Sequence, residues 1–236
     1  MSPVAPERRT FAASLDCNYL VTPPPAGVAE PLLAVALHGY GMDAQTMHRL
    51  SLPVVSHRAA LVSLEAPNQF YLGHPSETAA IGFNWGTRSH WGASIRLHQE
   101  MVRNALREAQ TWLAIPRERC LLLGFSQPVS MNYRFLAAHP HEVRGAIAIC
   151  GGIPGDWERD RAPLLESAIL HIARSEDEYY SVTRATTFET KLTAAARDFE
   201  FHMLPGKHRF PSQARSIVNA WMDRVWGKPT PRSEQS

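Results

Sequence analysis

The sequence LLLGFSQPV at positions 121–129 places a serine directly after an apolar run and directly before a helical pattern. Residues 121–125 contain only Leu, Gly and Phe and are predicted to form a buried strand, and 129–138 continues with helical spacing. A serine in such a strand-to-helix turn is held above the edge of a sheet, where its Oγ can react. Ser126 is therefore the candidate nucleophile, although a G-x-S pattern alone is also found in ordinary turns.

Short apolar runs alternate with longer helical patterns on both sides of this motif. The runs predicted to be strands are 15–21, 32–37, 60–64, 121–125, 146–150, 169–173 and 199–204. Amphipathic spacing predicts helices over 94–114, with Ser94 near its cap, and over about 212–225. Strands joined by helices indicate an α/β fold with a mostly parallel sheet. Prolines at 23–25 and Gly27 predict an antiparallel hairpin between the first two strands.

Length and composition narrow the class of protein further. The 236 residues fit one domain, 1–236, with flexible ends at about 1–10 and 227–236. A formal charge of +2 and the lack of a basic run give no support for a nucleic-acid partner. Three cysteines without a CxxC pair favour a reducing compartment, and no apolar run is long enough for a transmembrane segment. We therefore predict a cytoplasmic protein.

The loop after 32–37 reads His38-Gly39-Tyr40-Gly41. A loop in this place can supply a backbone N–H to the negative oxygen that forms when a serine attacks a carbonyl group. The residue after the serine supplies the second N–H. Tyr40 and Gln127 are therefore the candidate donors. The alternative for His38-Gly39 is a tight turn with a solvent-facing histidine.

A histidine and a carboxylate also follow predicted strands. His208 comes after 199–204, where a loop can carry a general base to the serine. The run SEDEYY at 175–180 comes after 169–173, and a carboxylate there can orient the imidazole. We choose Asp177 as this carboxylate, with Glu176 and Glu178 as alternatives. A further possibility is that the run is only a solvated acidic turn without a catalytic role. Five further histidines are expected to be structural or solvated: His98, His139, His141, His171 and His202.

Taken together, these motifs resemble the carboxylesterase, phospholipase and acyl-protein thioesterase family. The resemblance rests on HGYG at 38–41, GFSQ at 124–127, SEDEYY at 175–180 and GKH at 206–208, and it covers about 32–226. It implies an α/β-hydrolase fold with helices on both faces of the sheet. It also implies a nucleophile, two relay partners and two oxyanion donors: Ser126, Asp177, His208, Tyr40 and Gln127. No metal or organic cofactor is expected, because no ligand or phosphate-binding pattern is present.

Two positions depart from the family pattern, Pro128 in place of a small residue and Lys207 in place of a glycine. Proline is tolerated at the first helical position, where its missing N–H would have no partner. It leaves the N–H of Gln127 intact. It is nevertheless expected to move Gln127 out of the α region, because the proline ring crowds the residue before it.

The spacing of the predicted strands indicates how far the site is covered and which residues could contact a substrate. Only 151–168 separates two predicted strands, which is too short for an independent cap domain, so we expect an open site. The long irregular stretch 67–91 carries five aromatic residues that could line an acyl pocket or cover the sheet edge: Phe70, Tyr71, Phe83, Trp85 and Trp91.

These observations lead to a functional hypothesis, a serine carboxylic-ester hydrolase that acts on small, short-acyl esters through an acyl-enzyme. The expected partner is a small-molecule ester. The alternatives are a thioesterase or lysophospholipase of the same family, and a catalytically weakened α/β-hydrolase that binds a ligand.

Overall fold

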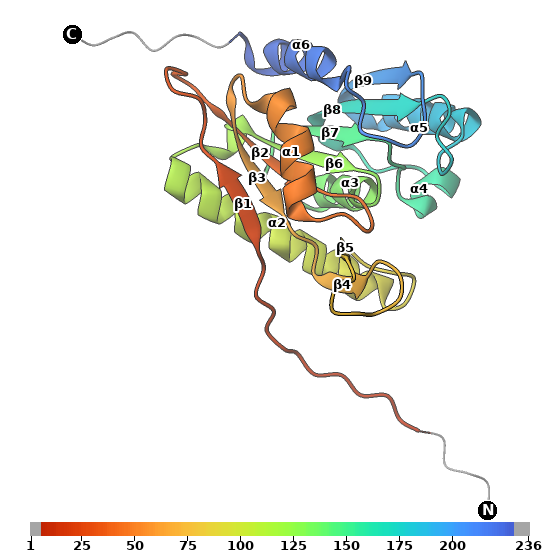
Figure 1. The fold of residues 1–236 in the computed structure, drawn as a ribbon. Coiled ribbons are helices and arrows are strands. Elements are labelled where there is room, and N and C mark those ends of the chain that lie inside the picture. Colours follow the sequence, from red (N-terminus) through yellow and green to blue (C-terminus); the bar gives the residue numbers. More distant parts are fainter. Residues whose placement is uncertain (1–5, 229–236) are drawn as a thin grey trace, which may run out of the picture.

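A twisted, mostly parallel sheet forms the centre of the molecule (Figure 1). The computed structural model describes residues 6–228, so the predicted flexible ends lie partly outside the described residues, at 1–5 and 229–236. The strands of the sheet are β1 (Tyr19–Thr22), β2 (Leu32–Leu37), β3 (Ala59–Leu64), β6 (Cys120–Phe125), β7 (Gly145–Ile149), β8 (Leu165–Arg174) and β9 (Ala196–Leu204). Their order across this seven-stranded sheet is β1-β3-β2-β6-β7-β8-β9.

Strand pairing confirms the predicted α/β class and corrects one detail. The neighbouring pairs from β3 to β9 are parallel, whereas β1 runs antiparallel to β3, with Tyr19 opposite Leu64. The predicted hairpin between the first two strands is therefore wrong. β2 is fully buried and pairs with β3 on one side and β6 on the other. Both of its edges are occupied, so β1 cannot pair with it, and β1 pairs instead at the outer edge of β3.

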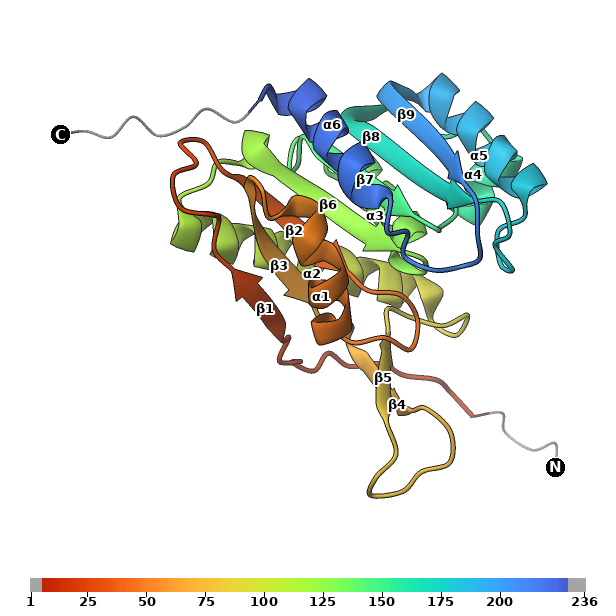
Figure 2. The same cartoon turned by 45° about the horizontal axis from the view of Figure 1, so that its top comes forward.

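Helices cover both faces of the sheet, as the resemblance implies (Figure 2). The helices are α1 (Ala44–Val55), α2 (Trp91–Leu113), α3 (Pro128–Ala138), α4 (Gly155–Arg159), α5 (Val182–Ala195), α6 (Ala214–Trp226) and a 3-10 turn at Arg117–Arg119. α2, α3 and α5 pack on one face, and α1 and α6 on the other. Alternate β2 side chains enter the two cores, Leu33 one and Leu32 the other. This explains why the strand reads as an unbroken apolar run.

Several helix and loop boundaries differ from expectation. α2 begins at Trp91, and His90 in the left-handed region precedes it in place of a Ser94 cap. α6 and α3 match their predicted ranges to within about two residues. The stretch expected to be irregular contains a hairpin of β4 (Asn68–Tyr71) and β5 (Ile81–Asn84), which projects from the body in Figure 2.

The connection between β7 and β8 holds only the five-residue helix α4, and no cap domain is present in the described chain, as expected. Among residues 6–228, none of the helices has both the length and the apolar composition needed to cross a bilayer. The strands β2, β6, β7, β8 and β9 run parallel and therefore end at one edge of the sheet. In open α/β sheets this carboxyl edge is where ligands bind.

Candidate active site

Ser126 lies in the turn between β6 and α3 with a left-handed backbone, at φ 63°. That conformation costs a non-glycine residue about 1–3 kcal/mol and persists only where its surroundings fix it. The Ser126 N–H donates to the Ile149 carbonyl at 2.9 Å, and the Ser126 carbonyl accepts from Val129 N–H at 3.2 Å. A Cβ at Gly151 would lie 2.8 Å from the Ser126 carbonyl oxygen. Any side chain at position 151 would collide with this turn, so the neighbouring loop needs a glycine there.

The structure brings Ser126, His208 and Asp177 into one hydrogen-bonded chain. His208 Nε2 lies 2.8 Å from Ser126 Oγ, and His208 Nδ1 lies 2.7 Å from Asp177 Oδ2. The other carboxylate oxygen, Oδ1, accepts from the N–H groups of Tyr179 at 2.8 Å and Tyr180 at 2.9 Å. Asp177 is nearly buried, at 8% exposure. A fixed carboxylate at Nδ1 selects the tautomer in which Nε2 can accept the serine proton.

The two alternative acids occupy different positions. Glu178 does not touch the imidazole; its Oε2 accepts from the backbone N–H of His208 at 2.9 Å. That hydrogen bond, as the main cause, lowers the pKa of Glu178 below its ordinary value. Glu176 is exposed, and its backbone N–H donates to the Gly206 carbonyl at 2.9 Å. Asp177 is thus the acid in contact with His208, and Glu178 supports the loop that carries it.

The two residues predicted to supply the oxyanion donors, Tyr40 and Gln127, line the same hollow as Ser126. Within residues 6–228, neither the Tyr40 N–H nor the Gln127 N–H donates to a protein group. The N–H of the following residue, Gly41, behaves differently, since it donates to the Phe83 carbonyl at 2.8 Å. Two free N–H groups beside the serine can stabilise an oxygen that gains negative charge.

Pro128 occupies the first position of α3 and is buried, so the fold accommodates its ring. The expected displacement of Gln127 is wrong, because Gln127 keeps the α conformation at φ −51° and ψ −49°. Its side chain explains why. Oε1 accepts from Trp85 N–H at 2.9 Å, and Nε2 donates to the Gly86 carbonyl at 2.8 Å. These two bonds hold the residue against the crowding of the proline.

A hollow of about 510 Å³ opens directly onto this serine. Five of its lining residues are aromatic and none is Lys, Arg, Asp or Glu: Gly39, Tyr40, Met42, Trp91, Phe125, Ser126, Gln127, Ser130, Tyr179, Tyr180 and His208. Sequence reasoning missed Met42, Phe125 and Ser130 as lining residues. Tyr179 and Tyr180 could have been found, because they directly follow the acid.

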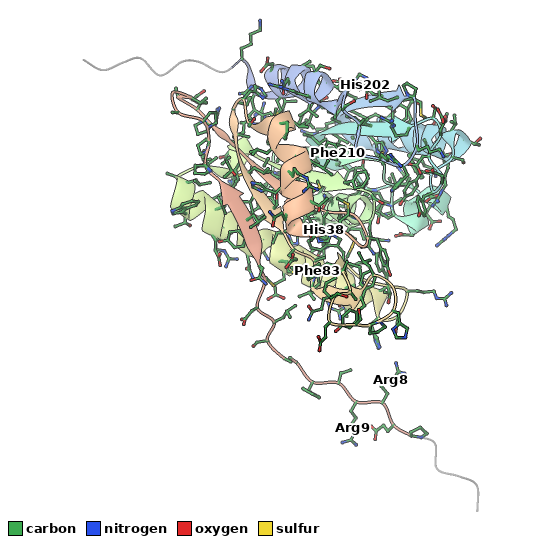
Figure 3. All side chains as sticks on the ribbon, viewed as in Figure 1. Arg8, Arg9, His38, Phe83, His202 and Phe210 are labelled. Atoms are coloured by element: carbon green, nitrogen blue, oxygen red, sulfur yellow. The ribbon has the colours of Figure 1, made fainter. Side chains whose placement is uncertain are left out.

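Of the five aromatic residues predicted for the pocket, only Trp91 lines the hollow. Trp85 is fully buried, and Phe83 packs against the core, beside His38 in Figure 3. Phe70 packs against the ring of Tyr40, at 5.0 Å between centroids, and Tyr71 lies on the exposed hairpin. The pairing of β4 with β5 directs these side chains to the core or the hairpin surface.

The histidines outside the relay are structural or distant from Ser126. His38 is fully buried, which rules out the solvent-facing alternative; its Nδ1 lies 2.8 Å from the Gly39 carbonyl. Burial lowers the pKa of His98 to about 3 and that of His171 to about 4. His202 lies on β9, at the top of Figure 3, and contacts Glu200.

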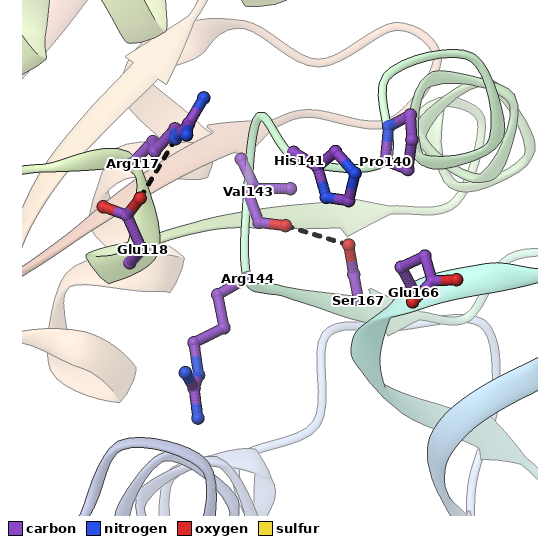
Figure 4. A pocket seen from close by; sticks show the side chains of 8 residues that line it. All are labelled: Arg117, Glu118, Pro140, His141, Val143, Arg144, Glu166 and Ser167. Atoms are coloured by element: carbon purple, nitrogen blue, oxygen red, sulfur yellow. Dashed lines mark hydrogen bonds and ion pairs between the residues drawn. The ribbon is translucent and has the colours of Figure 1, made fainter.

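A second hollow, of about 280 Å³, lies at the opposite end of the sheet (Figure 4). Its lining comes from the segments that enter β6, β7 and β8: Arg117, Glu118, Pro140, His141, Val143, Arg144, Glu166 and Ser167. The hydroxyl of Ser167 donates to the Val143 carbonyl at 2.9 Å, so it is not paired with a base. None of the predicted nucleophile, base, acid or oxyanion residues lies there.

One set of side chains in the described chain could hold a metal ion. Donor atoms of Cys150, Asp177 and His208 lie within 4.8 Å of one another. Burial raises the pKa of the Cys150 thiol to about 12, and the thiol donates to the Arg209 carbonyl at 3.5 Å. To bind here, a cation would have to replace the proton of the Cys150 thiol. It would also have to break the hydrogen bond between His208 and Asp177. The set is better suited to the relay, and the absence of a cofactor stays a prediction.

Comparisons with known proteins match this chain to a family model and to solved structures. Residues 24–225 match the model of a family described as phospholipase/carboxylesterase. A carboxylesterase from Mesorhizobium loti is 22% identical, with a TM-score of 0.68 over 90% of this chain and 97% of that chain. A Bacillus cereus carboxylesterase is 16% identical, with a TM-score of 0.67 over 89% and 95%. A phospholipase/carboxylesterase from Dyadobacter fermentans is 17% identical, with a TM-score of 0.62 over 89% and 97%. At these identities the solved structures show a shared fold. A search of curated proteins finds no match.

Proposed function

Because this chain belongs to the phospholipase/carboxylesterase family, we propose that it is a serine carboxylic-ester hydrolase that works through an acyl-enzyme. The observation that carries the proposal is the continuous hydrogen-bonded chain from Ser126 Oγ through His208 to Asp177, at 2.8 and 2.7 Å. A serine is a weak nucleophile until a neighbouring base takes its proton. This chain supplies the base and the carboxylate that orients it.

In the first half of the reaction, Ser126 Oγ adds to the ester carbonyl carbon while His208 Nε2 takes the hydroxyl proton. The negative charge that develops on the carbonyl oxygen is stabilised by the free N–H groups of Tyr40 and Gln127. The C–O bond to the alcohol then breaks, and His208 returns the proton to the leaving oxygen. Asp177 stabilises the imidazolium throughout.

In the second half, water replaces the alcohol. His208 Nε2 takes a proton from the water as its oxygen adds to the acyl carbon, and the same two N–H groups stabilise the new oxyanion. Collapse of this intermediate breaks the bond to Ser126 Oγ, which regains its proton from His208. The products are a carboxylic acid and free enzyme, so no cofactor is consumed.

The hollow favours small, uncharged acyl groups. Its lining contains no Lys, Arg, Asp or Glu, so it offers no partner for a charged head group. Aromatic side chains such as Trp91 and Tyr179 present flat apolar surface to an acyl chain. Without a cap domain only part of a long chain could be buried. This supports short-acyl esters as the substrates.

Replacement of Ser126 by alanine tests the proposal. Ser126→Ala should lower kcat for p-nitrophenyl esters by roughly 10⁴- to 10⁶-fold, because removing one member of a relay disables the unit. Ser130→Ala is the matched control, since Ser130 lines the same hollow but lies outside the relay. A fluorophosphonate should label the wild type and the control at Ser126. Labelling of another serine, with activity kept in Ser126→Ala, contradicts the assignment. An inert wild type that still shows ligand-dependent thermal shifts indicates a binding protein.

A further inference from the structure

The two proposed oxyanion donors lie on loops that are far apart in the sequence, and one short segment is hydrogen-bonded to both. This segment consists of β5 and the two residues that follow it, Trp85 and Gly86. We propose that Trp85 is a positioning residue that fixes the distance between the Tyr40 N–H and the Gln127 N–H. This inference rests on the proposed ester hydrolysis, and it gives Trp85 a role in that reaction.

The first set of contacts holds the loop that carries Tyr40. The Gly41 N–H donates to the Phe83 carbonyl at 2.8 Å, and the Phe83 N–H donates to the Met42 carbonyl at 3.0 Å. On the other side of Tyr40, the indole Nε1–H of Trp85 donates to the His38 carbonyl at 2.8 Å. The segment thus binds the loop both before and after Tyr40, which leaves its peptide little freedom to rotate.

The second set of contacts holds the turn that carries Gln127. The backbone N–H of Trp85 donates to Gln127 Oε1 at 2.9 Å, and Gln127 Nε2 donates to the Gly86 carbonyl at 2.8 Å. Both ends of the amide are therefore used. A side chain held at both ends limits rotation of its own backbone, so the Gln127 N–H is held in place beside Ser126.

Trp85 itself is immobilised by packing. It is 0% exposed, and its ring contacts His38 at 5.5 Å and His98 at 5.4 Å between centroids. His98 Nε2 in turn lies 3.1 Å from Asn132 Oδ1, on α3. Because hydrogen bonds in such a buried site are not exchanged with water, they hold their partners more firmly than exposed bonds do.

The distance between the two donors matters for the rate. An oxyanion hole works when each donor lies about 2.7–3.1 Å from the developing oxyanion. A displacement of about 1 Å can cost roughly 100-fold in rate. Loss of one indole hydrogen bond frees one side of the Tyr40 loop while the other contacts remain. The expected loss of rate is therefore smaller than the loss caused by removing one of the two N–H donors.

The test replaces Trp85 by phenylalanine, which keeps an aromatic ring and removes the Nε1–H. Trp85→Phe should lower kcat about 30-fold with KM within about threefold, since donors aimed at the oxyanion act in the transition state. The inhibition constant of an aryl trifluoromethyl ketone should rise by a similar factor. The carbonyl carbon of this inhibitor forms a bond to Ser126 Oγ. Its carbonyl oxygen then becomes an oxyanion in the position that the substrate oxyanion takes during ester hydrolysis.

Trp226→Phe is the matched control. Its indole Nε1–H donates to the Glu118 carbonyl at 2.8 Å, so the same type of bond is lost far from the site. The control should lose stability but keep kcat and the inhibition constant within about twofold. Equal effects of Trp85→Phe and Trp226→Phe on kcat and on the inhibition constant overturn the proposal, because the role of Trp85 is then only structural.

A second variant covers the case in which Trp85→Phe does not fold. Gln127→Met removes both side-chain bonds to the segment but keeps the backbone N–H, and it should weaken ketone inhibition at least tenfold. An unchanged inhibition constant in this variant contradicts the proposal. Failure of the proposed function looks different: the wild type then hydrolyses none of the esters, and the fluorophosphonate does not label Ser126.

Discussion

Asp177 and Glu178 show at the scale of single residues how one acidic run supplies two kinds of contact. Asp177 turns inward, is 8% exposed and contacts the imidazole of His208. Glu178 is half exposed and accepts from the backbone N–H of the same histidine. One carboxylate therefore orients the ring, whereas the other holds the loop at its backbone.

The contact of Glu178 predicts a modest effect on turnover. Glu178→Ala should lower kcat about three- to tenfold, because the His208 loop loses one anchor while the Asp177 contact remains. Glu178→Gln should behave like the wild type, since its amide oxygen can still accept. Initial rates with a p-nitrophenyl ester measure both variants. Glu176→Ala is the control, and a loss there as large as that of Glu178→Ala contradicts the assignment.

At the scale of elements, α2 and α3 are joined across one face of the sheet by a buried polar contact. His98 on α2 is 1% exposed, and its Nε2 lies 3.1 Å from Asn132 Oδ1 on α3. Burial disfavours the charged imidazolium and lowers the pKa of His98 to about 3. In the folded protein His98 is therefore neutral at neutral pH.

This buried histidine makes stability depend on pH. The unfolded chain takes up a proton at His98 near pH 6.5, whereas the folded chain does so only near pH 3. The unfolded state therefore binds more protons between these two values, and the contribution of His98 to stability, complete above pH 7, is lost progressively as the pH falls from about 6.5 to about 3. His98→Gln should reduce the slope of the unfolding free energy by about 1.4 kcal/mol per pH unit between pH 5.5 and 4.5. Urea denaturation of both proteins at several pH values gives the slopes; equal slopes contradict the prediction.

Pro128 at the start of α3 gives a second prediction for the elements. Pro128→Gly should lower the free energy of unfolding by about 1–2 kcal/mol, because glycine loosens the unfolded chain and removes a buried ring. The change in kcat should stay below about tenfold, since the Gln127 N–H is unaffected. Urea denaturation and ester hydrolysis measure the two effects. A gain in kcat above roughly 100-fold would mean that the proline misplaces this N–H.

At the scale of the whole molecule, six parallel strands end at one edge, and the loops after β2, β6, β8 and β9 meet around the hollow. Ser126 follows β6, Asp177 follows β8, and His208 follows β9. The connection between β7 and β8 adds only α4, so nothing in the described chain covers the hollow from that connection. The single-domain organisation and the cytoplasmic location stay predictions.

The open hollow predicts a preference among substrates. Esters with acyl chains of about two to eight carbons should be hydrolysed faster than emulsified long-chain triacylglycerols, because a hollow of about 510 Å³ buries only part of a long chain. A series of p-nitrophenyl esters measures kcat/KM against chain length. Ser126→Ala supplies the background rate. Faster turnover of the emulsified triacylglycerol than of a butyrate ester contradicts the prediction.

The sequence by itself determined the α/β class and the residues that meet at the candidate site. Each strand of the parallel sheet is a short apolar run, and such runs reveal burial on both faces without any knowledge of neighbours. Ser126, Asp177 and His208 could be chosen because each follows such a run, and parallel strands place their carboxyl ends together. Asp177 was also chosen from the sequence, with Glu176 and Glu178 as alternatives, and the structure shows Asp177 in contact with His208.

Only the tertiary structure decided which strand pairs with β1 and which aromatic rings face the hollow. Apolar composition does not tell whether a ring points to the core or to a cavity, and Trp85 was therefore expected in the pocket although it is fully buried. The hydrogen bonds of Trp85 and of the Gln127 side chain join loops far apart in the sequence. Such contacts depend on how the sheet and helices pack, which no local pattern encodes.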